Sequence, residues 1–170
     1  MPGRRPLTLL PRLAGDQPKA TLCFGPRQHL RRREWIPTAV EEKDAIREIL
    51  TEYCFRLDDG RFAEMAALFT ETGTWDTAFG RATGRAAIAD LARSLRERAG
   101  DQRPRGIHLV TNISIALDGA SARVRSNWTV VQNSPEGPEI GSGGSYQDEL
   151  IKEHGQWLFR YRKIDRFIAP

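Results

Sequence analysis

The stretch at residues 52–69, EYCFRLDDGRFAEMAALF, holds the end of one predicted helix, a turn and the start of another helix. Upstream of the turn, apolar residues recur at helical spacing, which predicts a buried stripe made of Ile46, Ile49, Leu50, Tyr53, Cys54 and Leu57. Thr38 and Glu41 form a capping box at the start of this helix. The DDG turn at 58–60 predicts that the helix ends after Leu57, with the glycine suited to a left-handed cap.

This predicted helix end matters for Tyr53 and Asp58. Five residues along a helix place two side chains about 140° apart, so these two would not share a helical face. If the helix stops at Leu57, however, Asp58 is free of the helical phase and can turn toward the face that carries Tyr53. The sequence therefore predicts that a phenol and a carboxylate converge where the helix breaks.

The remaining pattern predicts helices followed by a run of strands. A short helix is expected at 62–69, a short strand at 73–80, and a third helix after Gly84. From residue 105 the period changes to two: GIHLVTNISIAL, at 106–117, alternates between an Ile/Leu face and a face with His108, Asn112 and Ser114. Hairpin signals follow, so we expect an α+β domain whose helices cover one face of a curved sheet and leave a concave pocket.

Charge divides the chain of 170 residues into two parts. Residues 1–40 hold eight Lys/Arg and two Asp/Glu, which leaves 18 basic and 20 acidic residues in the remainder. We therefore expect residues 1–38 to be a flexible, basic, Pro/Arg-rich leader and residues 39–170 to be the folded domain. The domain has no basic stripe that predicts nucleic-acid binding. Along the sequence no apolar run is long enough for a membrane span, and the apolar run at residues 7–10 is too short for a secretory signal. A cytoplasmic location is the expectation.

Metal and cofactor chemistry are not predicted. His29, His108 and His154 are far apart, and no spacing typical of metal ligands brings them together with cysteines or acids. The glycine-rich GSGGS at 141–145 does not fit a phosphate-binding loop between a strand and a helix, and instead predicts a bulge or the start of a strand. We expect no cofactor and no metal.

Four residues are candidates for chemistry, although each taken alone also fits a structural role. His108 would be a general base if its strand face is turned to the pocket, or otherwise a hydrogen-bonded structural histidine. Tyr53 on an apolar helical face also fits the core, whereas Asp58 and Arg166 also fit solvated surface charges.

Five segments together resemble the SnoaL-like branch of the nuclear-transport-factor-like superfamily. They are YCFRLDDGRFAEMAALFTETGTW (53–75), TGRAAI (83–88), HLVTN (108–112), GSYQDEL (144–150) and GQWLFRYRKI (155–164), and the resemblance covers about residues 40–168. It implies a cone-shaped α+β barrel in which three N-terminal helices pack on a strongly curved antiparallel sheet. It also implies a homodimer or homotrimer.

The dehydratases of this superfamily, scytalone dehydratase and bile-acid 7α-dehydratase, suggest the catalytic residues. The resemblance implies that Tyr53, Asp58, His108 and Arg166 are catalytic, and it places Gln132 where the bile-acid enzyme has a further aspartate. We therefore expect a cofactor-independent lyase that dehydrates a cyclic, carbonyl-bearing, polyketide- or steroid-like molecule. In this hypothesis His108 takes a proton from carbon, Asp58 holds the imidazole, and Tyr53 donates to an oxygen.

The substrate is expected to be hydrophobic, because aromatic residues are available to line the pocket. The predicted substrate-binding residues are Phe69, Trp75, Asn112, Trp128, Gln132 and Tyr146. Two alternatives stay open. One is an isomerase of the ketosteroid type, and the other is a non-catalytic carrier or a structural subunit like the β chain of aromatic-ring dioxygenases.

Overall fold

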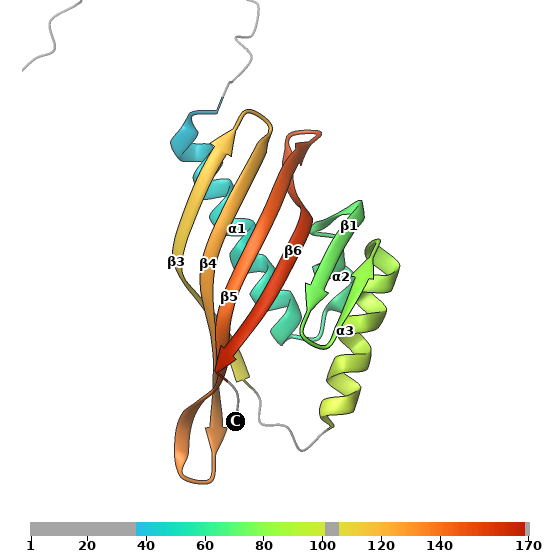
Figure 1. Cartoon of the computed structure of the whole chain (residues 1–170), viewed down its shortest axis with the longest axis vertical. Helices are drawn as coiled ribbons and strands as arrows, with labels where there is room; N and C mark the ends of the chain where they lie inside the picture. Colours follow the sequence, from blue (N-terminus) through green and yellow to red (C-terminus); the bar gives the residue numbers. More distant parts are fainter. Residues whose placement is uncertain (1–36, 101–105, 169–170) are drawn as a thin grey trace, which may run out of the picture. The chain divides into compact units, whose positions relative to one another are not determined.

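The computed structural model describes residues 37–100 and 106–168 of the chain. Its elements are α1 (Ala39–Asp58), α2 (Phe62–Ala66), β1 (Phe69–Thr77), β2 (Gly80–Thr83), α3 (Arg85–Ala99), β3 (Gly106–Asp118), β4 (Ser121–Ser134), β5 (Gly137–Glu153) and β6 (Gln156–Ile168). The predicted leader, up to residue 36, lies outside the described residues. The α+β class is confirmed (Figure 1).

The sheet is mixed, which corrects the expectation of a purely antiparallel sheet. Its strand order is β2-β1-β6-β5-β4-β3, and β1 pairs with β6 in parallel while every other pair is antiparallel. The parallel pair arises because α3 separates the β1–β2 hairpin from the four-strand meander, whose last strand returns beside β1. The single strand predicted at 73–80 is in fact this hairpin, and the predicted helix at 62–69 ends at Ala66.

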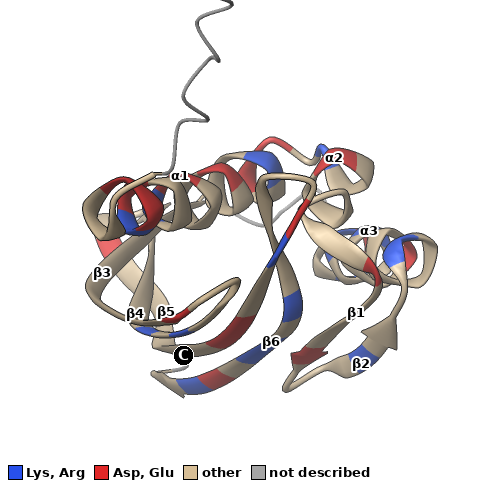
Figure 2. Cartoon of the chain, turned by 90° about the horizontal axis from the view of Figure 1, so that it is seen from above, with Lys and Arg blue, Asp and Glu red and all other residues tan. Residues whose placement is uncertain are grey.

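The three helices lie over the concave side of the curved sheet (Figure 2). The apolar stripe of α1 packs into the core, with Ile46, Leu50 and Tyr53 fully buried. The predicted capping box is confirmed, because Thr38 Oγ1 accepts from the Glu41 amide at 3.3 Å and Glu41 Oε2 accepts from the Thr38 amide at 2.7 Å. Neither α1 nor the shorter helices of the described residues combine the length and apolarity of a membrane span.

The end of α1 differs from the prediction by one residue. Gly60 has the expected left-handed conformation, with φ of +75°, but the helix continues through Asp58 instead of stopping at Leu57. Asp58 therefore stays in helical phase as the last residue of α1. Because it keeps that phase, its carboxylate contacts His108 on β3, whereas Tyr53, five residues earlier, faces the core.

A β-bulge in β3 overturns the predicted alternation of this strand. The register with β4 shifts between Thr111 and Ser114, and Asn112 has a left-handed φ of 53°. Because the extra residue exchanges the two faces, Ile107 and Leu109 are exposed, whereas the isoleucines and leucine beyond the bulge pack against the core. His108 thereby lies on the concave face, and the predicted continuous Ile/Leu face does not exist.

A buried ion pair lies within the core beneath the helices. Arg162 on β6 and Asp148 on β5 are both fully buried and form two hydrogen bonds of 2.8 Å. The guanidinium carbon also lies 4.0, 4.1 and 4.3 Å from the ring centroids of Tyr53, Tyr146 and Phe159. These contacts hold the rings of Tyr53, Tyr146 and Phe159 in place in the core.

Candidate active site

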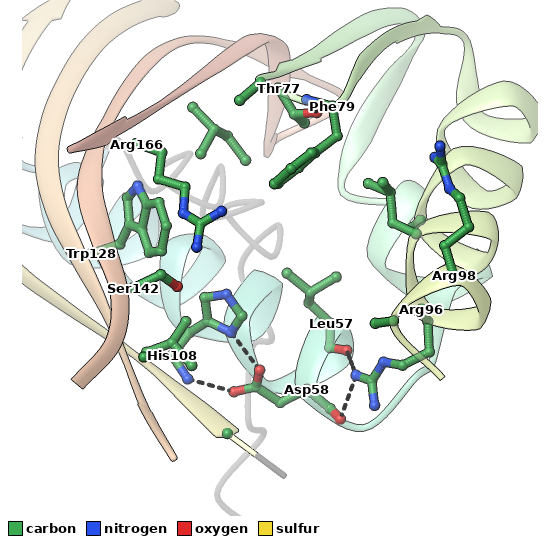
Figure 3. Close-up of a pocket in the computed structure, with 18 of the residues that line it drawn as sticks. Leu57, Asp58, Thr77, Phe79, Arg96, Arg98, His108, Trp128, Ser142 and Arg166 are labelled. Carbon is green, nitrogen blue, oxygen red and sulfur yellow. Dashed lines mark hydrogen bonds and ion pairs between the residues drawn. The ribbon is translucent and has the colours of Figure 1, made fainter. Parts of the chain in front are cut away.

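A cavity of about 800 Å³ lies between the concave face of the sheet and the ends of the helices (Figure 3). Its wall is mostly apolar and aromatic, and its size suits a fused-ring small molecule. The residues that line it are Leu57, Asp58, Phe62, Trp75, Thr77, Ala78, Phe79, Ala92, Leu95, Arg96, Arg98, Ala99, Gly100, Gly106, His108, Trp128, Val130, Gln132, Gly141, Ser142, Tyr146, Ile164 and Arg166.

The strand register explains how residues far apart in sequence share one wall. One cross-strand row brings His108, Val130 and Ser142 side by side, and the next brings Trp128, Gly144 and Arg166 together. The GSGGS stretch forms the irregular part of β5, where the register shifts against both neighbouring strands, as the sequence predicts. A Cβ on Gly144 would lie 1.9 Å from the Asp165 carbonyl oxygen, so β6 can approach here only because this residue has no side chain.

His108 and Asp58 form the polar centre of the cavity. Asp58 Oδ1 lies 2.5 Å from His108 Nδ1, and Asp58 Oδ2 accepts the His108 amide at 2.8 Å. The two contacts hold carboxylate and ring in one orientation. Figure 3 shows the other ring nitrogen, Nε2, on the cavity side of the ring. When the Nδ1 proton faces the carboxylate, Nε2 has a lone pair available to accept a proton. The imidazole is thus placed as a base, with a carboxylate behind it.

Arg96 on α3, which the sequence analysis missed, holds the end of α1 that carries this carboxylate. Its Nη2 donates to the carbonyl oxygens of Leu57 at 3.0 Å and Asp58 at 3.2 Å. These carbonyls are among the groups that a helix end leaves without an intrahelical partner. A basic residue in the last turn of the third predicted helix was the only sequence signal for this contact.

Two hydroxyl groups in the wall can donate to a substrate oxygen. Tyr146 on β5 is stacked on Trp128, with ring centroids 5.9 Å apart, and Ser142 occupies the row of His108. Burial raises the pKa of Tyr146 well above its ordinary value, so this phenol is a hydrogen-bond donor and not an anion at neutral pH. Ser142 was another residue that the sequence analysis missed.

Three of the predicted site residues are not part of the cavity wall. Tyr53 is fully buried; its hydroxyl accepts a hydrogen bond of 2.9 Å from Nε1 of Trp75, and burial raises its pKa. Phe69 packs edge-on to Tyr53 in the core. Asn112 is exposed on the bulge of β3. The convergence predicted for Tyr53 with Asp58 is therefore absent, because the phenol points into the core.

The other predicted residues do line the cavity. Asp58, His108 and Arg166 meet there with Trp75, Trp128, Gln132 and Tyr146. Gln132 donates to Glu139 at 3.1 Å, and Trp128 donates to the carbonyl of Asp165 at 3.2 Å. Within residues 37–100 and 106–168, no group of three or more His, Cys, Asp or Glu side chains is arranged to hold a metal ion.

The fold is shared by a protein with a cystatin-like fold from Nostoc punctiforme and an NTF2-like protein from Novosphingobium aromaticivorans, which at 22% and 21% identity show the fold alone. A family model for the SnoaL-like domain matches residues 38–163. The chain therefore belongs to the SnoaL-like domain family. A search of curated proteins gave no match.

Solved structures with the same fold agree with this assignment. A variant of Rv3472, a protein of unknown function from Mycobacterium tuberculosis, is 30% identical with a TM-score of 0.66, over 76% of each chain. A candidate scytalone dehydratase from Novosphingobium aromaticivorans is 27% identical with a TM-score of 0.62, over 76% of this chain and 86% of that one. The β subunit of a candidate aromatic-ring-hydroxylating dioxygenase from the same organism is 19% identical with a TM-score of 0.64, over 76% of this chain and 91% of that one. At that identity the likeness shows the fold alone.

Proposed function

We propose that the protein is a cofactor-independent dehydratase that removes water from a cyclic, carbonyl-bearing, polyketide- or steroid-like small molecule. The observation that carries this proposal is the His108–Asp58 pair, with its 2.5 Å contact, placed in an apolar cavity of about 800 Å³. The likeness to a candidate scytalone dehydratase supports the same class of reaction. The family is shared by proteins of differing function, so the residues of the cavity must carry the argument.

The first step is proton abstraction from the carbon next to the carbonyl group. Nε2 of His108 takes the proton, and Asp58 stabilises the imidazolium that forms, because its carboxylate faces Nδ1. Negative charge then grows on the carbonyl oxygen. Tyr146 and Ser142 are the wall hydroxyls that can donate to this oxygen, in place of the role expected of Tyr53.

The second step breaks the bond between the neighbouring carbon and its hydroxyl group. The electron pair of the enolate forms the new carbon–carbon double bond, and the leaving hydroxide needs one proton to become water. Among the described residues that line the cavity, Asp58 is the only carboxylic acid, and it is already bonded to His108. The imidazolium of His108 therefore returns its proton to the leaving group, so one residue serves as base and then as acid.

A simple cyclic β-hydroxyketone tests the reaction class. Incubation of the full chain with 3-hydroxy-1-tetralone should give 1-naphthol, a product lighter by one water, at a rate well above the buffer rate. Mass spectrometry with chromatography distinguishes the outcomes. A product of unchanged mass would indicate an isomerase instead, and binding without any product would indicate a carrier.

Self-association is a further part of the proposal. Ile107, Val131 and Ile140 lie side by side on β3, β4 and β5, on the outer face of the sheet. Ile107 is 57% exposed and Ile140 59% exposed, and an apolar row of this kind favours burial against a second copy. We expect sedimentation velocity to give the mass of a dimer or trimer, and Ile107→Lys to shift it toward the monomer. If the protein without substitutions sediments as a monomer, this expectation is wrong.

A further inference from the structure

Arg166 on β6 is a half-buried arginine whose charge is not neutralised within the described part of the chain. Its Nε donates to the carbonyl oxygen of Ile168 at 3.3 Å. Within residues 37–100 and 106–168, no carboxylate oxygen lies within 4.0 Å of its guanidinium, and no protein acceptor is bonded to its two terminal nitrogens. Figure 3 shows this guanidinium pointing into the same space as the ring of His108.

The other charged residues of the cavity wall are differently engaged. The Asp58 carboxylate is bonded to His108, and Arg96 is bonded to the carbonyls at the end of α1. Arg98 is exposed at the end of α3 and turns back to the carbonyl oxygen of Ser94 at 3.3 Å. The sheet wall of the cavity therefore carries a positive group next to apolar surface, and within the described residues no carboxylate oxygen lies within 4.0 Å of it.

The surroundings of Arg166 suit a planar anion attached to an aromatic body. Its guanidinium carbon lies 5.7 Å from the ring centroid of Phe79, and Trp128 lies in the same cross-strand row. A guanidinium presents two parallel N–H groups that match the two oxygens of a carboxylate. Partial burial makes such a pair stronger than it would be in open solvent.

The position of Arg166 relative to His108 sets the length of the molecule that could reach both. The two residues lie on β6 and β3, three strand spacings apart, so their Cα atoms are separated by roughly 15 Å before the curvature of the sheet is considered. Both side chains point inward and shorten this span. A molecule that contacts both residues would therefore lie along the sheet wall of the cavity between β3 and β6.

We infer that Arg166 binds a carboxylate group of the substrate, so that the substrate class is a cyclic carbonyl compound that also bears a carboxylate. This inference rests on the proposed function for the location of the site, and it makes Arg166 a specificity-determining residue. The reaction at His108 and the anchoring at Arg166 are separate properties of one cavity.

Calorimetric titration of the full chain with two probes of similar shape tests the inference. The anion 2-naphthoate should bind roughly 10- to 100-fold more tightly than the neutral 2-acetonaphthone, the range expected for a hydrogen bond to a charged group. Arg166→Gln should abolish this preference and leave the affinity for 2-acetonaphthone unchanged. The matched control Arg160→Gln, which changes an arginine of the same strand outside the cavity wall, should keep the preference. Equal affinities in the unchanged protein, failure of 2-naphthoate to bind, or a preference that survives Arg166→Gln would each overturn the inference.

A His108→Gln variant separates this test from that of the proposed function. It should lose dehydration of 3-hydroxy-1-tetralone and keep the preference for 2-naphthoate, because the carboxylate contact does not involve the imidazole. If the unchanged protein dehydrates no ketone but still prefers the anion through Arg166, the proposed function fails and the inference stands. If it dehydrates the ketone and shows no preference for the anion, the inference alone fails.

Discussion

His108→Ala is expected to lower the kcat for water elimination by about 10²–10⁴-fold, the usual contribution of a general base. The loss should lie near the upper end, because the proposed mechanism uses the same imidazole as base and then as acid. Formation of 1-naphthol from 3-hydroxy-1-tetralone measures the rate. Circular dichroism should show an unchanged fold, since His108 lies in the cavity wall and not in the core.

Two further variants make this prediction specific. Asp58→Asn should also lower kcat, because an amide in place of the carboxylate cannot stabilise the imidazolium and can select the wrong tautomer. His154→Ala is the matched control: this histidine lies exposed in the turn between β5 and β6, so full activity is expected. Undiminished turnover by His108→Ala would end the proposed mechanism.

Asp148→Ala is expected to lower the free energy of unfolding by about 3–5 kcal/mol, the cost of leaving a buried charge without its partner. Arg162 is fully buried, and its Nη1 already lacks a hydrogen-bond acceptor within the described residues. Removing the Asp148 carboxylate takes away both 2.8 Å hydrogen bonds that the Arg162 guanidinium donates to it. Urea denaturation followed by tryptophan fluorescence measures the change.

Two controls separate charge burial from loss of packing. The double variant Asp148→Leu, Arg162→Met removes both charges and should recover most of the loss, because a buried ion pair often contributes little relative to apolar residues of similar size. Glu149→Ala removes the partner of Arg160 in an exposed pair, with side chains 45% and 59% exposed, and should cost about 1 kcal/mol or less. If Asp148→Ala also lowers the free energy of unfolding by only about 1 kcal/mol, the prediction of a costly buried charge is wrong.

Local patterns predicted much of the fold. The capping box at Thr38, the apolar stripe of α1, the left-handed Gly60 and the irregular glycine-rich part of β5 depend on neighbours within a few residues, so the sequence specifies them directly. The change of period after residue 105 predicted a curved sheet covered by helices, and the family resemblance implied the same arrangement. The resemblance and the pattern together also singled out His108 and Asp58, which the structure places in contact.

The errors arose where long-range packing decides the outcome. The bulge at Asn112 could not be read from alternation, and it exchanges the faces of β3 on either side of it. Tyr53 follows the apolar stripe into the core, where Trp75 and Arg162 contact it, and it does not reach the cavity. Arg96 and Ser142 enter the site through contacts with elements far away in sequence.

The sequence by itself therefore determined the order of helices and strands, the family, and His108 and Asp58 as candidate residues. Only the tertiary structure decided which side chains share a cavity, because that depends on strand register and on the direction in which each element presents its side chains. A shift of one residue reverses a strand face, and a one-residue extension of α1 keeps Asp58 in helical phase beside His108. Spacing along the chain does not specify either of these offsets.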